Sequence, residues 1–195
     1  MEYQQTIWTI GHSTRSIEEF IEMLLAFQIA VLVDVRSFPG SRRFPQFNKE
    51  NLADSLLTNK IDYVHILRLG GRRTPKKDSR NTGWKQESFR GYADYMETEY
   101  FKKGIEELIE IAEKRKTAIM CSEAVWWKCH RSMISDYLKL NGWDVQHIMD
   151  KAKTEEHPYT QVAKIINGEL DYSGDELFYY FTGPGILRLL QNNSL

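Results

Sequence analysis

Apolar residues along the chain follow two spacings, one typical of strands and one typical of helices. Short runs are apolar on both faces, as in strands buried within a parallel sheet, whereas longer segments repeat apolar residues every three or four positions. The five expected strands cover residues 7–11, 30–35, 61–66, 117–121 and 144–149. Because helical segments separate them, the pattern predicts a three-layer α/β/α domain with a mostly parallel five-stranded sheet.

Polar residues with short side chains mark where the helices are expected to begin. Such a residue at the N-cap accepts a hydrogen bond from a backbone N–H of the first helical turn. The expected N-caps are Ser16, which forms a capping box with Glu19, then Asn48 and Ser132. A longer helical region, from about 87 to 114, contains Gly104, which we expect to divide it.

The pattern weakens after residue 151. Residues 159–166 are expected to form one more helix, and residues 177–181 form an apolar cluster rich in aromatic side chains. We interpret residues 1–150 as one α/β domain and residues 151–195 as a C-terminal extension packed on it. A chain of 195 residues is long enough to bury a core without disulfides or metal.

Composition argues for a cytoplasmic protein. The chain has two cysteines, no signal peptide at its N-terminus and no apolar run long enough to cross a membrane. The formal net charge of -1 indicates no particular partner. We expect no membrane association, and the sequence leaves the oligomeric state open.

The distribution of charge is more informative than its sum. Residues 36–49 contain four bases and no acid, and residues 68–85 contain seven bases and one acid. Both segments interleave arginines with aromatic residues, a combination that binds phosphates and stacks nucleic-acid bases. The partner that these segments favour is an anionic ligand, either a nucleotide or a nucleic acid.

Polar residues follow three of the expected strands, in the motifs Gly11-His12-Ser13, Asp34-Val35-Arg36 and Cys121-Ser122-Glu123. Ligands of parallel sheets bind outside the carboxyl ends of the strands, so the three motifs should meet in one crevice. A fourth motif, Cys129-His130-Arg131, comes just before the helix that is expected to begin at Ser132, whose free N–H groups favour anions. The sequence therefore predicts an anion-binding site at this edge of the sheet.

These motifs together resemble a known family. Thr9 to Ser13, Leu32 to Arg36 with Pro39 and Ser41, Leu69-Gly70-Gly71, and the two motifs of the segment from Cys121 to Arg131 are similar in order and spacing to the family called domain of unknown function 488. The resemblance spans about residues 9–149. It implies an α/β fold and a shared polar site, and it implies no particular reaction.

The cysteines allow two further interpretations. Cys121, Cys129, His130 and His12 could supply thiolate and imidazole ligands suited to zinc or iron, and the metal-binding alternative uses Cys129, His130 and His12. Seven residues separate the two cysteines, unlike the two to four of common zinc motifs, so no cofactor is predicted and zinc or iron is the alternative. Cys129 is also the better candidate for a reactive thiol. Cys121 is interpreted as a small buried core residue.

We expect an enzyme that acts on a phosphate-bearing ligand in this crevice. The expected catalytic residues are Glu123 and His130, which would transfer protons, with His12 and Asp34 orienting them. The expected ligand-binding residues are Ser13, Arg36, Arg72, Arg131 and Cys129. The alternatives are a non-catalytic nucleic-acid-binding module that uses the basic segments, and a metal-binding protein with Cys and His ligands.

Overall fold

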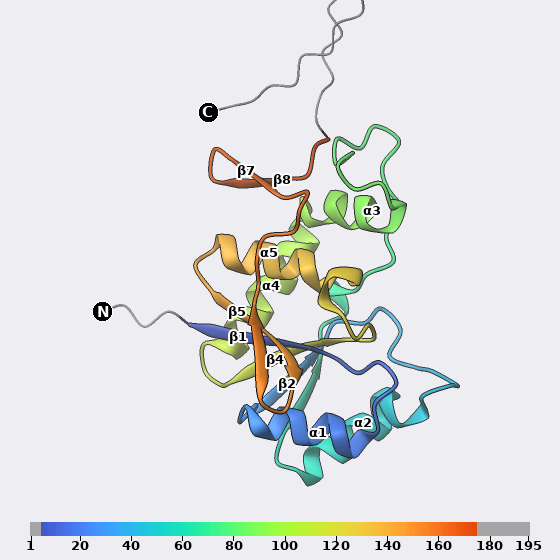
Figure 1. Ribbon diagram of the computed structural model, residues 1–195. Helices are drawn as coiled ribbons and strands as arrows, with labels where there is room; N and C mark the ends of the chain where they lie inside the picture. Colours follow the sequence, from blue (N-terminus) through green and yellow to red (C-terminus); the bar gives the residue numbers. More distant parts are fainter. Residues whose placement is uncertain (1–4, 175–195) are drawn as a thin grey trace, which may run out of the picture.

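A six-stranded sheet forms the centre of the protein in the computed structural model, which describes residues 5–174 (Figure 1). Its strands are β1 Thr6–Gly11, β2 Val31–Asp34, β3 Asp62–His65, β4 Thr117–Cys121, β5 Asp144–Asp150 and β6 Lys153–Glu156. The order is β3-β2-β4-β1-β5-β6, and every neighbouring pair is parallel except β5 with β6. The five expected strands are confirmed, and β6 is an addition.

Helices cover both faces of the sheet, which confirms the three-layer arrangement (Figure 1). Helices α1 Ile17–Ala26 and α2 Lys49–Thr58 lie on one side, and α3 Glu87–Met96, α4 Glu99–Ala112 and α5 Arg131–Leu140 lie on the other. Side chains of a strand alternate between its faces. Leu32 accordingly packs in the core under α1 and α2, and its neighbours Val31 and Val33 pack in the core on the opposite face.

The helix boundaries correct two of the sequence predictions. The Ser16 side chain accepts a hydrogen bond from the Glu19 backbone, as expected. Ser132, however, lies inside α5, whose N-cap position is held by His130. The break between α3 and α4 falls at Thr98, which caps α4, and Gly104 lies within α4, where a Cβ atom would be 2.8 Å from Cβ of Arg68. Gly104 therefore serves close packing and does not divide the helix.

Asn48 occupies the N-cap position of α2, but its side chain does not cap the helix. Its Oδ1 atom instead accepts a hydrogen bond from the backbone N–H of Ser41. The residue therefore fixes the basic loop that precedes the helix.

The helix predicted over residues 159–166 is wrong. The segment contains β7 Lys164–Ile166, which pairs with β8 Glu169–Asp171 as an antiparallel hairpin. Asn167 and Gly168 connect these strands, both at positive φ, as a two-residue hairpin turn requires. The expected apolar cluster at 177–181 lies outside the described residues.

A buried acid attaches the segment after β6 to the domain. Asp136 of α5 accepts hydrogen bonds from the Thr160 backbone N–H, the Thr160 hydroxyl, the Tyr172 hydroxyl and Nε2 of His157. Nδ1 of His157 lies 2.9 Å from Nε2 of His147 in β5. These contacts join the extension to α5 and to the sheet. In the part of the chain that the structure describes, no helix is both long and apolar enough to cross a bilayer.

Candidate functional site

Three central strands bring the polar motifs together at one edge of the sheet. Strands β2, β4 and β1 are neighbours, with Gly11 paired with Cys121, and Asp34 paired with Met120. The backbone N–H groups of His12 and Ser13 donate to the carbonyls of Cys121 and Ser122. The first and third motifs are thus joined directly, as expected from their positions at parallel strand ends.

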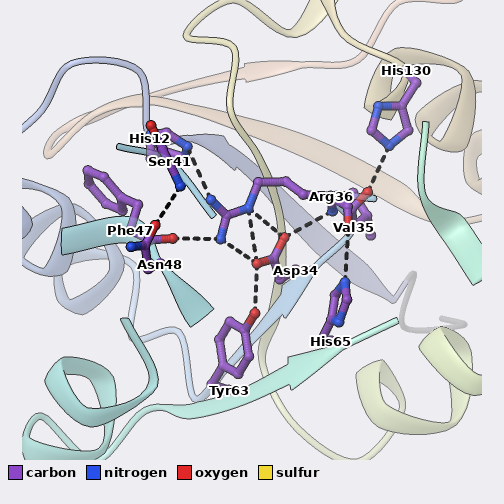
Figure 2. A network of polar contacts seen from close by, with 10 residues as sticks. All are labelled: His12, Asp34, Val35, Arg36, Ser41, Phe47, Asn48, Tyr63, His65 and His130. Carbon is purple, nitrogen blue, oxygen red and sulfur yellow. Dashed lines mark hydrogen bonds and ion pairs between the residues drawn. The ribbon is translucent and has the colours of Figure 1, made fainter. Parts of the chain in front are cut away.

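Asp34 and Arg36 form a buried ion pair at the end of β2 (Figure 2). Nη2 of Arg36 lies 2.6 Å from Oδ2 of Asp34, and Nε lies 2.9 Å from Oδ1. The same carboxylate accepts a hydrogen bond from the Tyr63 hydroxyl, and Nη2 of Arg36 also donates to the Phe47 carbonyl. Asp34 is fully buried, so this network holds the end of the strand in place.

His12 packs against this ion pair. Its ring stacks on Phe47 at a centroid distance of 4.3 Å, Nδ1 donates to the Ser13 carbonyl, and Nε2 lies 3.5 Å from Nη1 of Arg36 (Figure 2). Burial and, after it, the charge of Arg36 lower the pKa of His12 to about 4. The ring is therefore neutral at pH 7, and both of its nitrogens face protein groups.

Arg131 lies at the start of α5 and holds the loop that follows β4. Its side chain is buried, and its two Nη atoms donate to the carbonyls of Glu123 and Ala124 at 2.7 and 3.0 Å. A Cβ atom on Gly11 would lie 1.7 Å from that Glu123 carbonyl oxygen. The glycine thus leaves room for the loop that Arg131 fixes.

Cys121, Cys129 and His130 lie together below this loop. Their ligand atoms are all within 4.8 Å of one another, and Nδ1 of His130 is 3.8 Å from Sγ of Cys121 and 3.7 Å from Sγ of Cys129. Nε2 of His130 donates to the Val35 carbonyl at 3.0 Å (Figure 2). In the neutral ring, Nδ1 is therefore the unprotonated nitrogen, and it faces both sulfurs.

The two thiols differ in acidity. The hydrogen bond with Cys129 and burial raise the pKa of Cys121. Burial also opposes ionisation of Cys129, but the Cys121 hydrogen bond, the Arg131 charge and the Arg131 backbone N–H outweigh it and lower the pKa to about 7. Cys129 is the more acidic thiol, in the direction that its position before the helix predicts.

A cavity of about 270 Å³ opens above these three side chains. Its other lining residues include Arg36, Gly71, Arg72, Glu123 and Lys128. Glu123, Arg72 and Lys128 are exposed, whereas His12, Ser13, Asp34 and Arg131 do not line the cavity. The predicted site residues therefore divide into a group that faces the cavity and a group behind its walls, which is buried except for the half-buried Ser13.

Comparison with known proteins found one match, to a protein-family model. The family model described as "Domain of unknown function DUF488" matches residues 16–138, more than half of the chain. The chain belongs to this family. No curated protein and no solved structure matches significantly. The family region contains Asp34, Arg36 and the segment from Cys121 to Arg131, and it begins after His12 and Ser13.

Sequence reasoning missed several residues of the cavity within this family region. Cys121, interpreted as core, is buried but lines the cavity beside Cys129. Gly71 passes so close to His130 that a Cβ atom would be 2.8 Å from Nδ1. The Gly70-Gly71 pair was a visible signal of close approach. Lys128, in a loop crowded with aromatic residues, gave no such signal.

The alternative metal set also changes. His12, which we grouped with Cys129 and His130, is held between Phe47, Ser13 and Arg36, outside the cluster. In the described part of the chain, the grouping suited to a metal is Cys121, Cys129 and His130.

Proposed function

We propose that the protein is an enzyme acting on a small phosphate-bearing ligand, such as a nucleotide, bound in the cavity above Cys121, Cys129 and His130. One observation carries the proposal: two basic side chains line the cavity without an acidic partner. Among residues 5–174, neither Arg72 nor Lys128 forms an ion pair, although Arg72 lies over the ring of Phe38. An anion could therefore bind both bases without displacing a protein carboxylate.

The buried arginines have a different role in this proposal. Arg36 and Arg131 already bond to Asp34, Phe47 and the loop carbonyls. We assign them to holding the cavity walls, with His12 and Asp34 keeping Arg36 in place. Ser13, which hydrogen-bonds through its backbone to the loop after β4, belongs to the same support.

Proton transfer falls to Glu123 in this proposal. Its carboxylate is exposed and lines the cavity, whereas Nδ1 of His130 faces the two sulfurs. A carboxylate within reach of a bound phosphate ester can serve as a general acid or base. A reducing compartment such as the cytoplasm would keep both cysteines as free thiols.

Cavity size favours a small ligand over a nucleic-acid strand. About 270 Å³ is near the lower end of small-molecule sites. Part of the second basic segment is also neutralised, because Arg68 pairs with Glu107 and Lys76 pairs with Glu97. These pairs reduce the charge that a nucleic-acid-binding module would use.

Calorimetric titration of nucleoside monophosphates and inorganic phosphate into the protein tests the proposal. Arg72→Ala and Lys128→Ala should each weaken binding about tenfold, because each removes a charged hydrogen bond. Arg42→Ala is the matched control, since Arg42 is exposed in the first basic segment and does not line the cavity. Glu123→Gln should retain binding and lose turnover of any ligand that the wild type converts.

Two outcomes would overturn the proposal. Wild-type protein that binds none of these ligands would remove the ligand class. Equal weakening by Arg42→Ala and Arg72→Ala, together with tighter binding of oligonucleotides and a steep salt dependence, would favour the nucleic-acid-binding module.

A further inference from the structure

We infer that Cys121, Cys129 and His130 bind one divalent transition-metal ion, zinc by preference, with a fourth coordination position open to the cavity. The inference deepens the proposed function and rests on it only for the use of that fourth position. The three side chains of the cluster lie together in the protein without any ligand. Metal binding therefore does not require the phosphate-bearing ligand.

The spacing of the three side chains suits tetrahedral coordination. Zinc lies about 2.3 Å from thiolate sulfur and about 2.0 Å from imidazole nitrogen, which at a tetrahedral angle separates sulfur and nitrogen by about 3.5 Å. The two measured separations from His130 Nδ1 are 3.8 and 3.7 Å. An ion between the three atoms would need only small movements of the side chains.

His130 is oriented as a metal ligand should be. Metal-binding histidines donate their second ring N–H to a carbonyl or carboxylate, which fixes the tautomer and the ring plane. His130 donates from Nε2 to the Val35 carbonyl, so Nδ1 carries the free lone pair (Figure 2). Gly71 and the Tyr92 ring, at a centroid distance of 4.9 Å, pack against the imidazole and restrict its rotation.

The set of donors favours zinc and leaves a position free. Two thiolates and an imidazole suit zinc among common divalent ions, and sites with three protein ligands and one open position are typical of catalytic zinc. All three side chains line the cavity together with Glu123 and Arg72. The open position would therefore face the space in which the phosphate-bearing ligand is proposed to bind, where a bound ion would act as a Lewis acid.

Cobalt(II) titration of the reduced, full-length protein tests the inference directly. Thiolate-bound cobalt absorbs in the near ultraviolet by charge transfer from sulfur, so the wild type should show this band saturating at one cobalt per chain. Added zinc should abolish the band, because zinc displaces cobalt from such sites. Elemental analysis of protein purified without chelator should find zinc in the same ratio.

Variants locate the ion. Cys121→Ser and Cys129→Ser should each lose at least half of the sulfur band and weaken zinc binding more than tenfold, and His130→Gln should weaken zinc binding similarly. His12→Gln is the control, because His12 lies outside the cluster and should leave stoichiometry and band unchanged. The wild-type spectrum alone stays decisive if a variant fails to fold.

Other outcomes overturn the inference. A wild-type protein without the sulfur band would show that the cluster does not bind the metal, and a Cys121–Cys129 disulfide as its only product in air would indicate a redox pair in its place. Loss of the metal in His12→Gln but not in Cys121→Ser would show that the ion is held by other ligands and would also overturn the inference. A protein that binds zinc but binds no phosphate compound would contradict only the proposed function, and one that binds a phosphate compound but no metal would contradict only this inference.

Discussion

Close contacts at single residues determine the shape of the candidate site. Gly71 lies against the His130 ring, and Gly11 lies against the carbonyl that Arg131 holds. Both positions face a backbone or ring atom that cannot move freely, because it is itself hydrogen-bonded. The site therefore depends on these two glycines, which have no side chain, as much as on its reactive residues.

Gly71→Ala tests this dependence. The added Cβ would lie 2.8 Å from His130 Nδ1, so the ring must shift from its present position beside the sulfurs. We expect a loss of about 1–3 kcal/mol in the free energy of unfolding, measured by urea denaturation, and weaker cobalt binding. Gly40→Ala is the control, since its Cβ would meet nothing within 4 Å. An unchanged cobalt affinity in Gly71→Ala would show that the glycine does not position His130.

At the scale of elements, periodicity predicted the five strands well, because buried parallel strands are apolar on both faces. Strand β6 was missed because Lys153–Glu156 is polar and lies at the sheet edge. Strand β7 lay within the segment 159–166 that was taken for a helix, although the Asn167-Gly168 pair that follows it is a strong turn signal.

The candidate site, like the fold, could be predicted only in part. Strand-end motifs predicted which residues would gather, since that depends only on parallel order. Which of them face the cavity depends on side-chain contacts between distant parts of the chain, such as those of Arg36 with the Phe47 carbonyl and with His12. No spacing within the sequence encodes these contacts.

Asp136→Asn tests how the extension is attached to α5. The carboxylate is fully buried and accepts four hydrogen bonds, including those of His157 and Tyr172. The amide would place an N–H group against these donors, and we expect the free energy of unfolding to fall by about 3 kcal/mol. Hydrogen exchange should accelerate over residues 157–172. Asp54→Asn, at an exposed position, should change neither measurement; equal effects of the two substitutions would refute this role of Asp136.

For the whole molecule, two buried histidines make stability depend on pH. Burial, then Arg36, lowers the pKa of His12 to about 4, and burial, then His157 and Arg131, lowers that of His147 to about 2. Below pH 6.5 the unfolded chain protonates both rings, whereas the folded chain leaves them neutral. Stability should therefore fall as the pH falls from 6.5 toward 4, by about 1.4 kcal/mol per pH unit for each histidine.

Urea denaturation between pH 7 and pH 5 measures this slope, and His12→Gln should reduce it by one proton. A stability that does not change over this range would mean that the rings are protonated in the folded protein as readily as in the unfolded chain.

We propose that the cavity at the carboxyl ends of β2 and β4 is the binding site of a phosphate-bearing ligand. The most direct test is an amide chemical-shift titration of the labelled, reduced protein with a nucleoside monophosphate. We predict that the shifted amides lie in residues 36–38, 71–72, 86–89 and 121–130, around the cavity. Shifts confined to the exposed basic residues 42–43 and 76–77, or no shifts at all, would contradict the claim.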